Sequence, residues 1–127
     1  MLGELQAESG RTAVAQENCA EALVLQRDLG DHTGQASTLD VLGRLAHRTG
    51  RSRDALTHHY RALSLFLATD NMYQAAETLD QLGRVHAALH DRRQAHVEWQ
   101  RALALYQDQN RVASADRVRS RLASLGR

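Results

Sequence analysis

The chain has 127 residues, 43% of them hydrophobic and 24% charged, with a formal net charge of +1, which suits one domain with its own core. Its sixteen basic residues are all arginines scattered among acids, so the positive field that nucleic-acid binding requires is missing, and no apolar run of about 18 residues is present to span a membrane. The single cysteine, Cys19, excludes an intrachain disulfide and a four-thiolate metal site, and we expect a cytoplasmic protein.

The composition predicts an all-α protein. Proline, which breaks helix interiors, is absent. Valine, tyrosine and phenylalanine are sparse and do not alternate with polar residues, as a half-buried strand requires. A chain of this kind can be helical nearly throughout.

A forty-residue repeat organises the chain. Thirteen of forty positions are identical between residues 31–70 and 71–110, which is far above chance, and the Leu-Gly pair at 42–43 returns at 82–83. An internal period of this length is typical of stacked repeat units. We therefore divide the single array into an incomplete first unit (1–30), two complete units (31–70 and 71–110) and a terminal helix (111–127).

Taken in order, residues 1–9 look like the last turns of a helix that ends near Gly10. The first complete unit predicts a helix over 35–49, stopped by a left-handed Gly50, and a second helix with Ser52 as its N-cap. Asp70 and Asn71 form the turn into the next unit.

The second complete unit predicts helices over 73–89 and 92–108. His90 lies where Gly10 and Gly50 lie and marks a helix end. Asp91 is the N-cap of the second helix, and Gln94 completes a capping-box pattern. A further helix over 111–125 follows, which gives about six or seven helices stacked as antiparallel hairpins in a superhelix, or solenoid.

Small residues at fixed offsets predict close helix crossings. A glycine inside a helix costs about 0.5–1 kcal/mol relative to alanine, so Gly43 and Gly83 indicate that another helix approaches closely. We expect Ala55 and Ala95 to face these glycines, and Ala62 and Ala102 to face the next hairpin.

This pattern resembles the tetratricopeptide repeat, a family with a Leu-Gly pair in the first helix, an alanine twelve residues later, an aromatic residue four later and an alanine three beyond that. Three consecutive units match over nearly the whole chain. The repeat-packing positions that the resemblance implies are Gly3, Ala15, Cys19, Ala22, Gly43, Ala55, His59, Ala62, Gly83, Ala95, Trp99 and Ala102.

Two features depart from the usual family pattern. The unit is longer, and Leu67 and Gln107 stand where proline is common. Units of forty residues resemble those of bacterial SARP-type and STAND-type regulators, notably of actinobacteria, and of kinesin light chains. The chain is either a fragment of a longer array, which we favour, or a small protein whose last helix caps the stack with a polar outer face.

The family implies a protein-binding groove along the concave face, built mainly from first helices. Arg44 and Arg84 would lie one above the other and bind carboxylates of an extended partner. Alternatively, Asp40–Arg44 and Asp80–Arg84 form i,i+4 ion pairs that partly neutralise the groove. Acids at these two positions do not fit the family's carboxylate clamp for chaperone tails. The predicted groove residues are Ser37, Asp40, Val41, Arg44, His47, Arg48, Glu77, Asp80, Gln81, Arg84 and Ala88.

No catalytic set or cofactor motif is visible. His86 and His90 share a helical spacing but lack a third metal ligand, and His59 is expected as a core histidine, so we predict no metal and no enzymatic activity. Three functions stay open: a protein or peptide-binding module, a sensor of a small molecule or peptide pheromone, and a structural spacer that forms homodimers through its terminal helices. We expect no nucleic acid or membrane partner.

Overall fold

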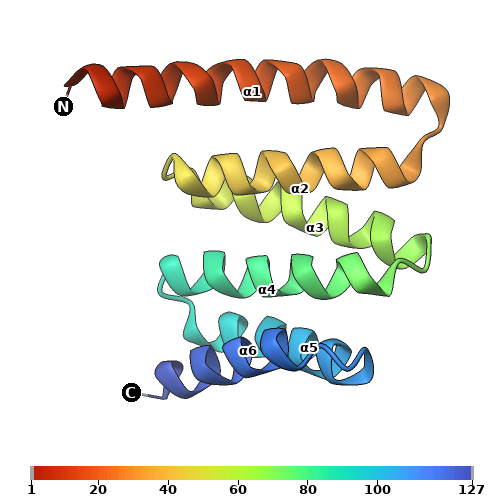
Figure 1. The fold of residues 1–127 in the computed structure, drawn as a ribbon, viewed down its shortest axis with the longest axis vertical. Helices are drawn as coiled ribbons and strands as arrows, with labels where there is room; N and C mark the ends of the chain where they lie inside the picture. The colour runs from red at the N-terminus through yellow and green to blue at the C-terminus, as the bar shows by residue number, and fades with distance from the viewer. Residues whose placement is uncertain (1, 127) are drawn as a thin grey trace.

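A computed structural model describes the backbone of residues 2–126 and the side chains of residues 10–126. Within that range the protein consists of six α-helices and no strands, and each helix packs on the next in sequence. Figure 1 shows them stacked in order, with the two termini at opposite ends. The predicted all-α solenoid is confirmed. The helices are α1 (Leu2–Leu29), α2 (His32–Arg48), α3 (Ser52–Ala68), α4 (Met72–Ala88), α5 (Arg92–Asp108) and α6 (Val112–Leu125).

The joints between helices share one design at twenty-residue intervals. Each has a left-handed residue, with φ between 56° and 79°, at Gly30, Gly50, Asp70, His90 and Asn110. The next amide in the chain donates to a carbonyl five residues earlier, as from Arg51 to Ala46 at 2.8 Å, which satisfies a helix end that would otherwise lack partners. The predicted helix ends at 50, 70 and 90 are therefore confirmed.

Two capping predictions need correction. Ser52 is the first residue of α3 rather than its N-cap, which is Arg51 and has no side-chain cap bond. Asp91 does cap α5, because its side chain accepts from the Gln94 amide at 3.1 Å. Its own amide donates to the carbonyl of His86 instead, so the backbone joint replaces the second half of the capping box.

The expected helix end near Gly10 is wrong. Gly10 lies inside α1, which continues without a break over 28 residues. The predicted packing role of Gly3 lies outside the residues whose side chains are described.

The core follows the stripes of the amphipathic helices. The largest buried side chains include Leu39, Phe66, Leu79, Leu82 and Tyr106, each less than 2% exposed or at that limit. They join small residues of α4 and α5 in one cluster that runs through the stack. Because this core fixes the hairpins to one another, the first helices α2 and α4 hold their outer side chains in a constant register.

Candidate functional site

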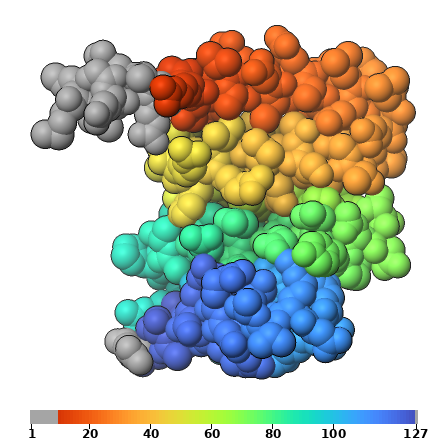
Figure 2. All heavy atoms as spheres, in the orientation of Figure 1, coloured from red at the N-terminus to blue at the C-terminus, as the bar shows by residue number. Residues whose placement is uncertain are grey.

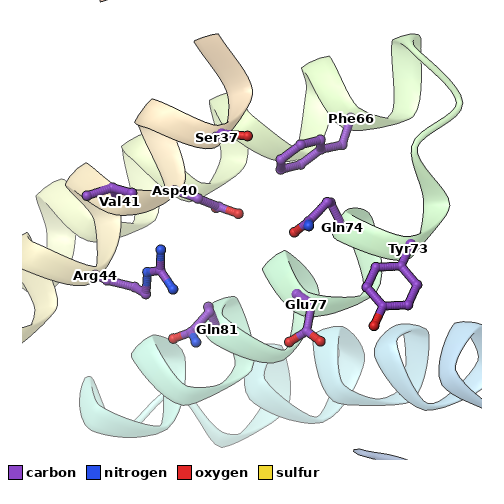
Figure 3. Close-up of a pocket in the computed structure, with 9 residues that line it drawn as sticks. All are labelled: Ser37, Asp40, Val41, Arg44, Phe66, Tyr73, Gln74, Glu77 and Gln81. Carbon is purple, nitrogen blue, oxygen red and sulfur yellow. The ribbon is translucent and has the colours of Figure 1, made fainter. Parts of the chain in front are cut away.

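A hollow lies between α2 and α4, on the face that the sequence predicted as a groove. Its volume is about 380 Å³. Figure 3 shows Asp40 and Arg44 of α2 facing Glu77 and Gln81 of α4 across this hollow. The wall consists mostly of polar and charged side chains, and its residues are Ser37, Asp40, Val41, Arg44, Phe66, Tyr73, Gln74, Glu77 and Gln81.

Six of the eleven predicted groove residues line this hollow: Ser37, Asp40, Val41, Arg44, Glu77 and Gln81. Sequence reasoning missed Tyr73 and Gln74, although both lie one turn before Glu77 on the same helix face. It also missed Phe66, which reaches the hollow from α3. The other five predicted residues, which do not line the hollow, are His47, Arg48, Asp80, Arg84 and Ala88.

Asp40 is engaged by two neighbouring helices. The Nδ1 of His59 on α3 lies 2.9 Å from Oδ1, and the hydroxyl of Thr78 on α4 donates to Oδ2 at 2.7 Å. The Asp40 side chain is 13% exposed. Its carboxylate therefore joins two consecutive units, and its hydrogen-bonding capacity is largely used inside the protein.

Asp80 occupies the equivalent place one unit later and is buried. Its carboxylate accepts from Trp99 Nε1 at 3.1 Å and from Arg121 of α6 at 2.8 and 3.1 Å. The hydroxyl of Tyr106 donates to the same group at 3.4 Å. The prediction of Asp80 as a groove residue is corrected, because Arg121 reaches over it from the next first helix.

Glu77 is held by Arg111. The guanidinium donates to Glu77 and to the carbonyl of Tyr73, and it lies 3.7 Å from the Tyr73 ring centre and 4.6 Å from that of Tyr106. Burial and the carboxylates of Asp80 and Glu77 raise the pKa of Tyr106, which keeps its hydroxyl a donor. A single arginine thus fixes the start of α6 against α4.

Arg44 and Arg84 have no ion pairs in the described part of the chain, whereas the carboxylates around them are bound within the protein. Both are exposed, and neither has an ion-pair partner within residues 10–126. The proposed i,i+4 pairs with Asp40 and Asp80 are therefore not formed. Glu77 and Asp80 form ion pairs with arginines of α6 or its N-terminal joint, and Asp40 is hydrogen-bonded by His59 and Thr78, so the exposed charged side chains of this face that lack such partners within the described residues are the two arginines.

The predicted close crossings at Gly43 and Gly83 are present, but rings fill them. A Cβ on Gly43 would lie 2.6 Å from the His59 ring, and one on Gly83 would lie 2.4 Å from Trp99. Ala55, expected to face Gly43, lies in a buried cluster with Ala46 and Val85. His59 is buried as expected of a core histidine.

The burial of the predicted repeat-packing residues differs between the complete units and α1. Ala55, Ala62, Ala95 and Ala102 have no exposed surface. The equivalent α1 residues Ala15, Cys19 and Ala22 are only partly buried, and among the described helices α1 packs chiefly on α2.

A second polar cluster lies between α3, α4 and α5. The hydroxyl of Tyr60 is hydrogen-bonded to Nε2 of His86 at 2.9 Å, and Glu98 is 1% exposed beside Arg101. Burial is the main cause that raises the pKa of Tyr60 to about 12, and the nearby Glu98 is the second. Burial lowers the pKa of His86.

This cluster does not suggest metal chemistry. Among the described residues, no three histidine, cysteine, aspartate or glutamate side chains gather as metal ligands would. His90 is an exposed joint residue and does not join His86. Over the same residues, no helix has the length and apolar character needed to cross a membrane.

Comparisons with known proteins agree with the geometry. A family model described as "Tetratricopeptide repeat" matches residues 1–68. The solved structure of BtubC (BKLC) from P. vanneervenii is similar, with a TM-score of 0.69 and 19% sequence identity over 98% of this chain. The chain spans about 60% of the length of that protein, and the likeness concerns the fold. No curated protein matches the sequence.

Proposed function

Because the chain belongs to the tetratricopeptide repeat family, whose repeats generally mediate protein–protein interaction and whose fold is typically non-enzymatic, we propose that the face of α2 and α4 binds an extended, acidic segment of a protein partner. The observation that carries this proposal is which charged side chains on this face have partners within the protein and which do not. Asp80 and Glu77 are paired with arginines and Asp40 is hydrogen-bonded by His59 and Thr78, whereas Arg44 and Arg84 are exposed without ion pairs among the described residues.

The shape of the hollow favours a peptide over a small molecule. Enclosure of the predicted groove residues Val41, His47 and Ala88 in one pocket would favour a small molecule, but only Val41 lies in the wall. Ser37, Gln74 and Gln81 offer donors and acceptors for a peptide backbone. The exposed ring of Tyr73, at 58% exposure, supplies an apolar surface beside them.

The test compares two matched double variants. Arg44→Ala with Arg84→Ala removes the two unpaired charges, and Arg53→Ala with Arg93→Ala removes two exposed charges at the same forty-residue spacing on α3 and α5. Fluorescence polarisation would measure binding of labelled peptides rich in glutamate and aspartate and of the same peptides with lysine substituted. Circular dichroism and melting would confirm that both variants keep their helicity.

We expect acidic peptides to bind, with an affinity that falls as salt rises. The affinity of the Arg44/Arg84 variant for acidic peptides should be lower by about tenfold or more. Hydrogen bonds to charged groups contribute about 1.5–3 kcal/mol, and a tenfold change in affinity corresponds to about 1.4 kcal/mol. The Arg53/Arg93 variant should bind as the parent does. Equal loss in both variants, or preference for lysine peptides, would contradict the proposal.

The proposal also extends to context. The forty-residue unit and the absence of lysine and isoleucine, whose codons are AT-rich, support a segment of a larger bacterial regulatory protein in the cytoplasm, in which this face has a sensing or autoinhibitory role. Reading the flanking coding sequence tests this idea. A neighbouring nucleotide-binding or DNA-binding region in the same frame would support it, and its absence would contradict it.

A further inference from the structure

Asp40 and Asp80 occupy equivalent positions, but their negative charges are compensated differently. Asp80 is paired with Arg121 at 2.8 Å, and the indole nitrogen of Trp99 also donates to its carboxylate. Neither of these two side chains changes its charge near neutral pH. The charge of Asp80 is therefore compensated throughout the physiological pH range.

Asp40 lacks this permanent counter-charge. Forty positions before Arg121 stands Gln81, which lines the same hollow as Asp40 and carries no charge. Among the described side chains, the ion-pair partner of Asp40 is His59, whose Nδ1 lies 2.9 Å from Oδ1. Histidine is the side chain that ordinarily changes its charge between about pH 5 and 8. Compensation of the Asp40 charge therefore depends on the protonation of one imidazole.

The geometry identifies the nitrogen of His59 that takes up the proton. An ionised carboxylate only accepts hydrogen bonds, so Nδ1 carries a hydrogen and donates it to Asp40. In the neutral ring, Nε2 then has no hydrogen. This atom is buried beside Gly43 and has no hydrogen-bond partner among the described residues. A proton added at Nε2 makes the ring a cation while the bond to Asp40 is kept.

Other charged and titratable groups lie around this pair. His47 and His58 interact electrostatically with His59, and burial lowers the pKa of both. They therefore take up protons at a lower pH than an ordinary histidine does. Glu77, across the hollow, is already paired with Arg111. The charged and titratable groups around the pair are Arg44 and His47 of α2, His58 of α3, and Glu77 and Arg84 of α4.

Asp40 is also part of the binding face. Its side chain is 13% exposed and lines the hollow together with Arg44, and Figure 3 shows both side chains on the α2 wall. While His59 is neutral, the carboxylate places a negative charge beside Arg44 and repels an acidic peptide. When His59 is a cation, the pair has no net charge, and the attraction between Arg44 and the peptide is less opposed.

Building on the proposed function, we infer that the Asp40–His59 pair controls this face, which binds acidic segments more tightly when His59 is protonated. Figure 2 shows α2 and α4 in the middle of the stack, between α1 and α6, so the control does not depend on either end helix. An acidic peptide keeps its charge between about pH 5.5 and 7.5, since aspartate and glutamate titrate near pH 4. A change of affinity over this range therefore reports a change in the protein.

Peptide binding at two pH values tests the inference. Fluorescence polarisation, with a dye whose emission does not depend on pH, would measure the affinity for a glutamate-rich peptide at about pH 7.5 and 5.5. The affinity should be about threefold or more higher at the lower pH, because one repelling charge near the peptide is compensated. Circular dichroism at both pH values would confirm that the protein is folded.

Gln81→Arg gives Asp40 the counter-charge that Arg121 gives Asp80. This variant should bind acidic peptides more tightly than the parent at pH 7.5 and lose most of the pH dependence, because Asp40 is then compensated at both pH values. Gln74→Arg is the matched control, since it adds the same charge to the same hollow at a position that is not equivalent to Arg121. It should raise the affinity at both pH values and keep the pH dependence. Equal loss of the pH dependence in both variants would overturn the inference.

The protonation of His59 can be followed without a peptide. Nitrogen-15 NMR of the imidazole rings, assigned through bonds to the backbone, should show a cation forming at His59 as the pH falls from about 8 to 5. A ring that keeps one protonation state over this range, or equal peptide affinity at both pH values, would overturn the inference and leave the proposed function standing.

His47→Gln should keep most of the pH dependence of binding, and its loss in this variant would assign the effect to His47 and overturn the inference. Absence of peptide binding at every pH would contradict the proposed function itself. The NMR titration would in that case still decide whether the Asp40–His59 pair changes its charge.

Discussion

Trp99 lies against Gly83 with its indole nitrogen hydrogen-bonded to Asp80 at 3.1 Å. One side chain thus closes the crossing of α4 with α5 and satisfies the carboxylate three residues before the glycine. His59 repeats the arrangement with Gly43 and Asp40. The ring fills the space that the missing side chain leaves, so this relationship explains why both hairpins keep a glycine inside a helix.

Gly83→Leu should destabilise the protein by about 1–3 kcal/mol or more through overpacking. A Cβ at this position would lie 2.4 Å from the ring of Trp99, which is buried and hydrogen-bonded to Asp80. Denaturant unfolding followed by circular dichroism would measure the change.

Gly10→Ala provides the comparison, because nothing lies within 4 Å of a Cβ there. It should stabilise the helix by about 0.5–1 kcal/mol. Equal effects of the two substitutions would contradict the assigned packing.

Asp80→Asn should cost about 1.5–3 kcal/mol, because Arg121, Trp99 and Tyr106 all donate to this carboxylate. In asparagine an NH2 group replaces one of the two accepting oxygens, so it faces a donor from a neighbouring side chain. The substitution also leaves Arg121 without its counter-charge. Thermal melting measures the loss. Asp116→Asn, at an exposed ion pair with Arg119, should change stability by less than about 1 kcal/mol. If Asp80 were a free groove residue, the two variants would behave alike.

Arg111→Lys should loosen α6 while conserving charge. Lysine cannot reproduce the planar stacking on Tyr73 and Tyr106 together with the bond to Glu77, and we expect a loss of about 0.5–2 kcal/mol. The rate of hydrogen exchange should increase more for the backbone amides of α6 than for those of α4. Arg119→Lys, on the exposed face, should leave exchange unchanged.

Stability should fall as the pH drops from about 7.5 to 5.5. Burial lowers the pKa of His47, His58 and His86 from 6.5 in the folded chain. The unfolded chain therefore binds more protons over the range between the lowered and ordinary values, and stability declines as pH falls through it. Melting temperatures across this range measure the slope, and His86→Gln should reduce it. A slope of opposite sign would show that these histidines gain charge on folding.

Much of the candidate face could be read from the sequence, but its electrostatics could not. Helical spacing placed Ser37, Asp40, Val41 and Arg44 on one face of α2. The equivalent residues of α4, forty positions later, are Glu77, Asp80, Gln81 and Arg84. Of the two alternatives for Arg44 and Arg84, the i,i+4 ion pairs with Asp40 and Asp80 are not formed, and helical spacing gave no sign of the actual partners of these acids. The observed partner of Asp80 is forty-one residues away, at Arg121.

The sequence by itself determined the helices, the twenty-residue joints and the close crossings, because these depend on local backbone preference and on the size of side chains at fixed offsets. Only the tertiary structure decided which charges stay unpaired. Thr78, Arg111 and Arg121 come from the following unit to bind Asp40, Glu77 and Asp80. Such contacts depend on the rotation between stacked hairpins, which no single helix encodes. Gly10 also illustrates this, because its place in the repeat predicted a helix end whereas the structure has it inside α1.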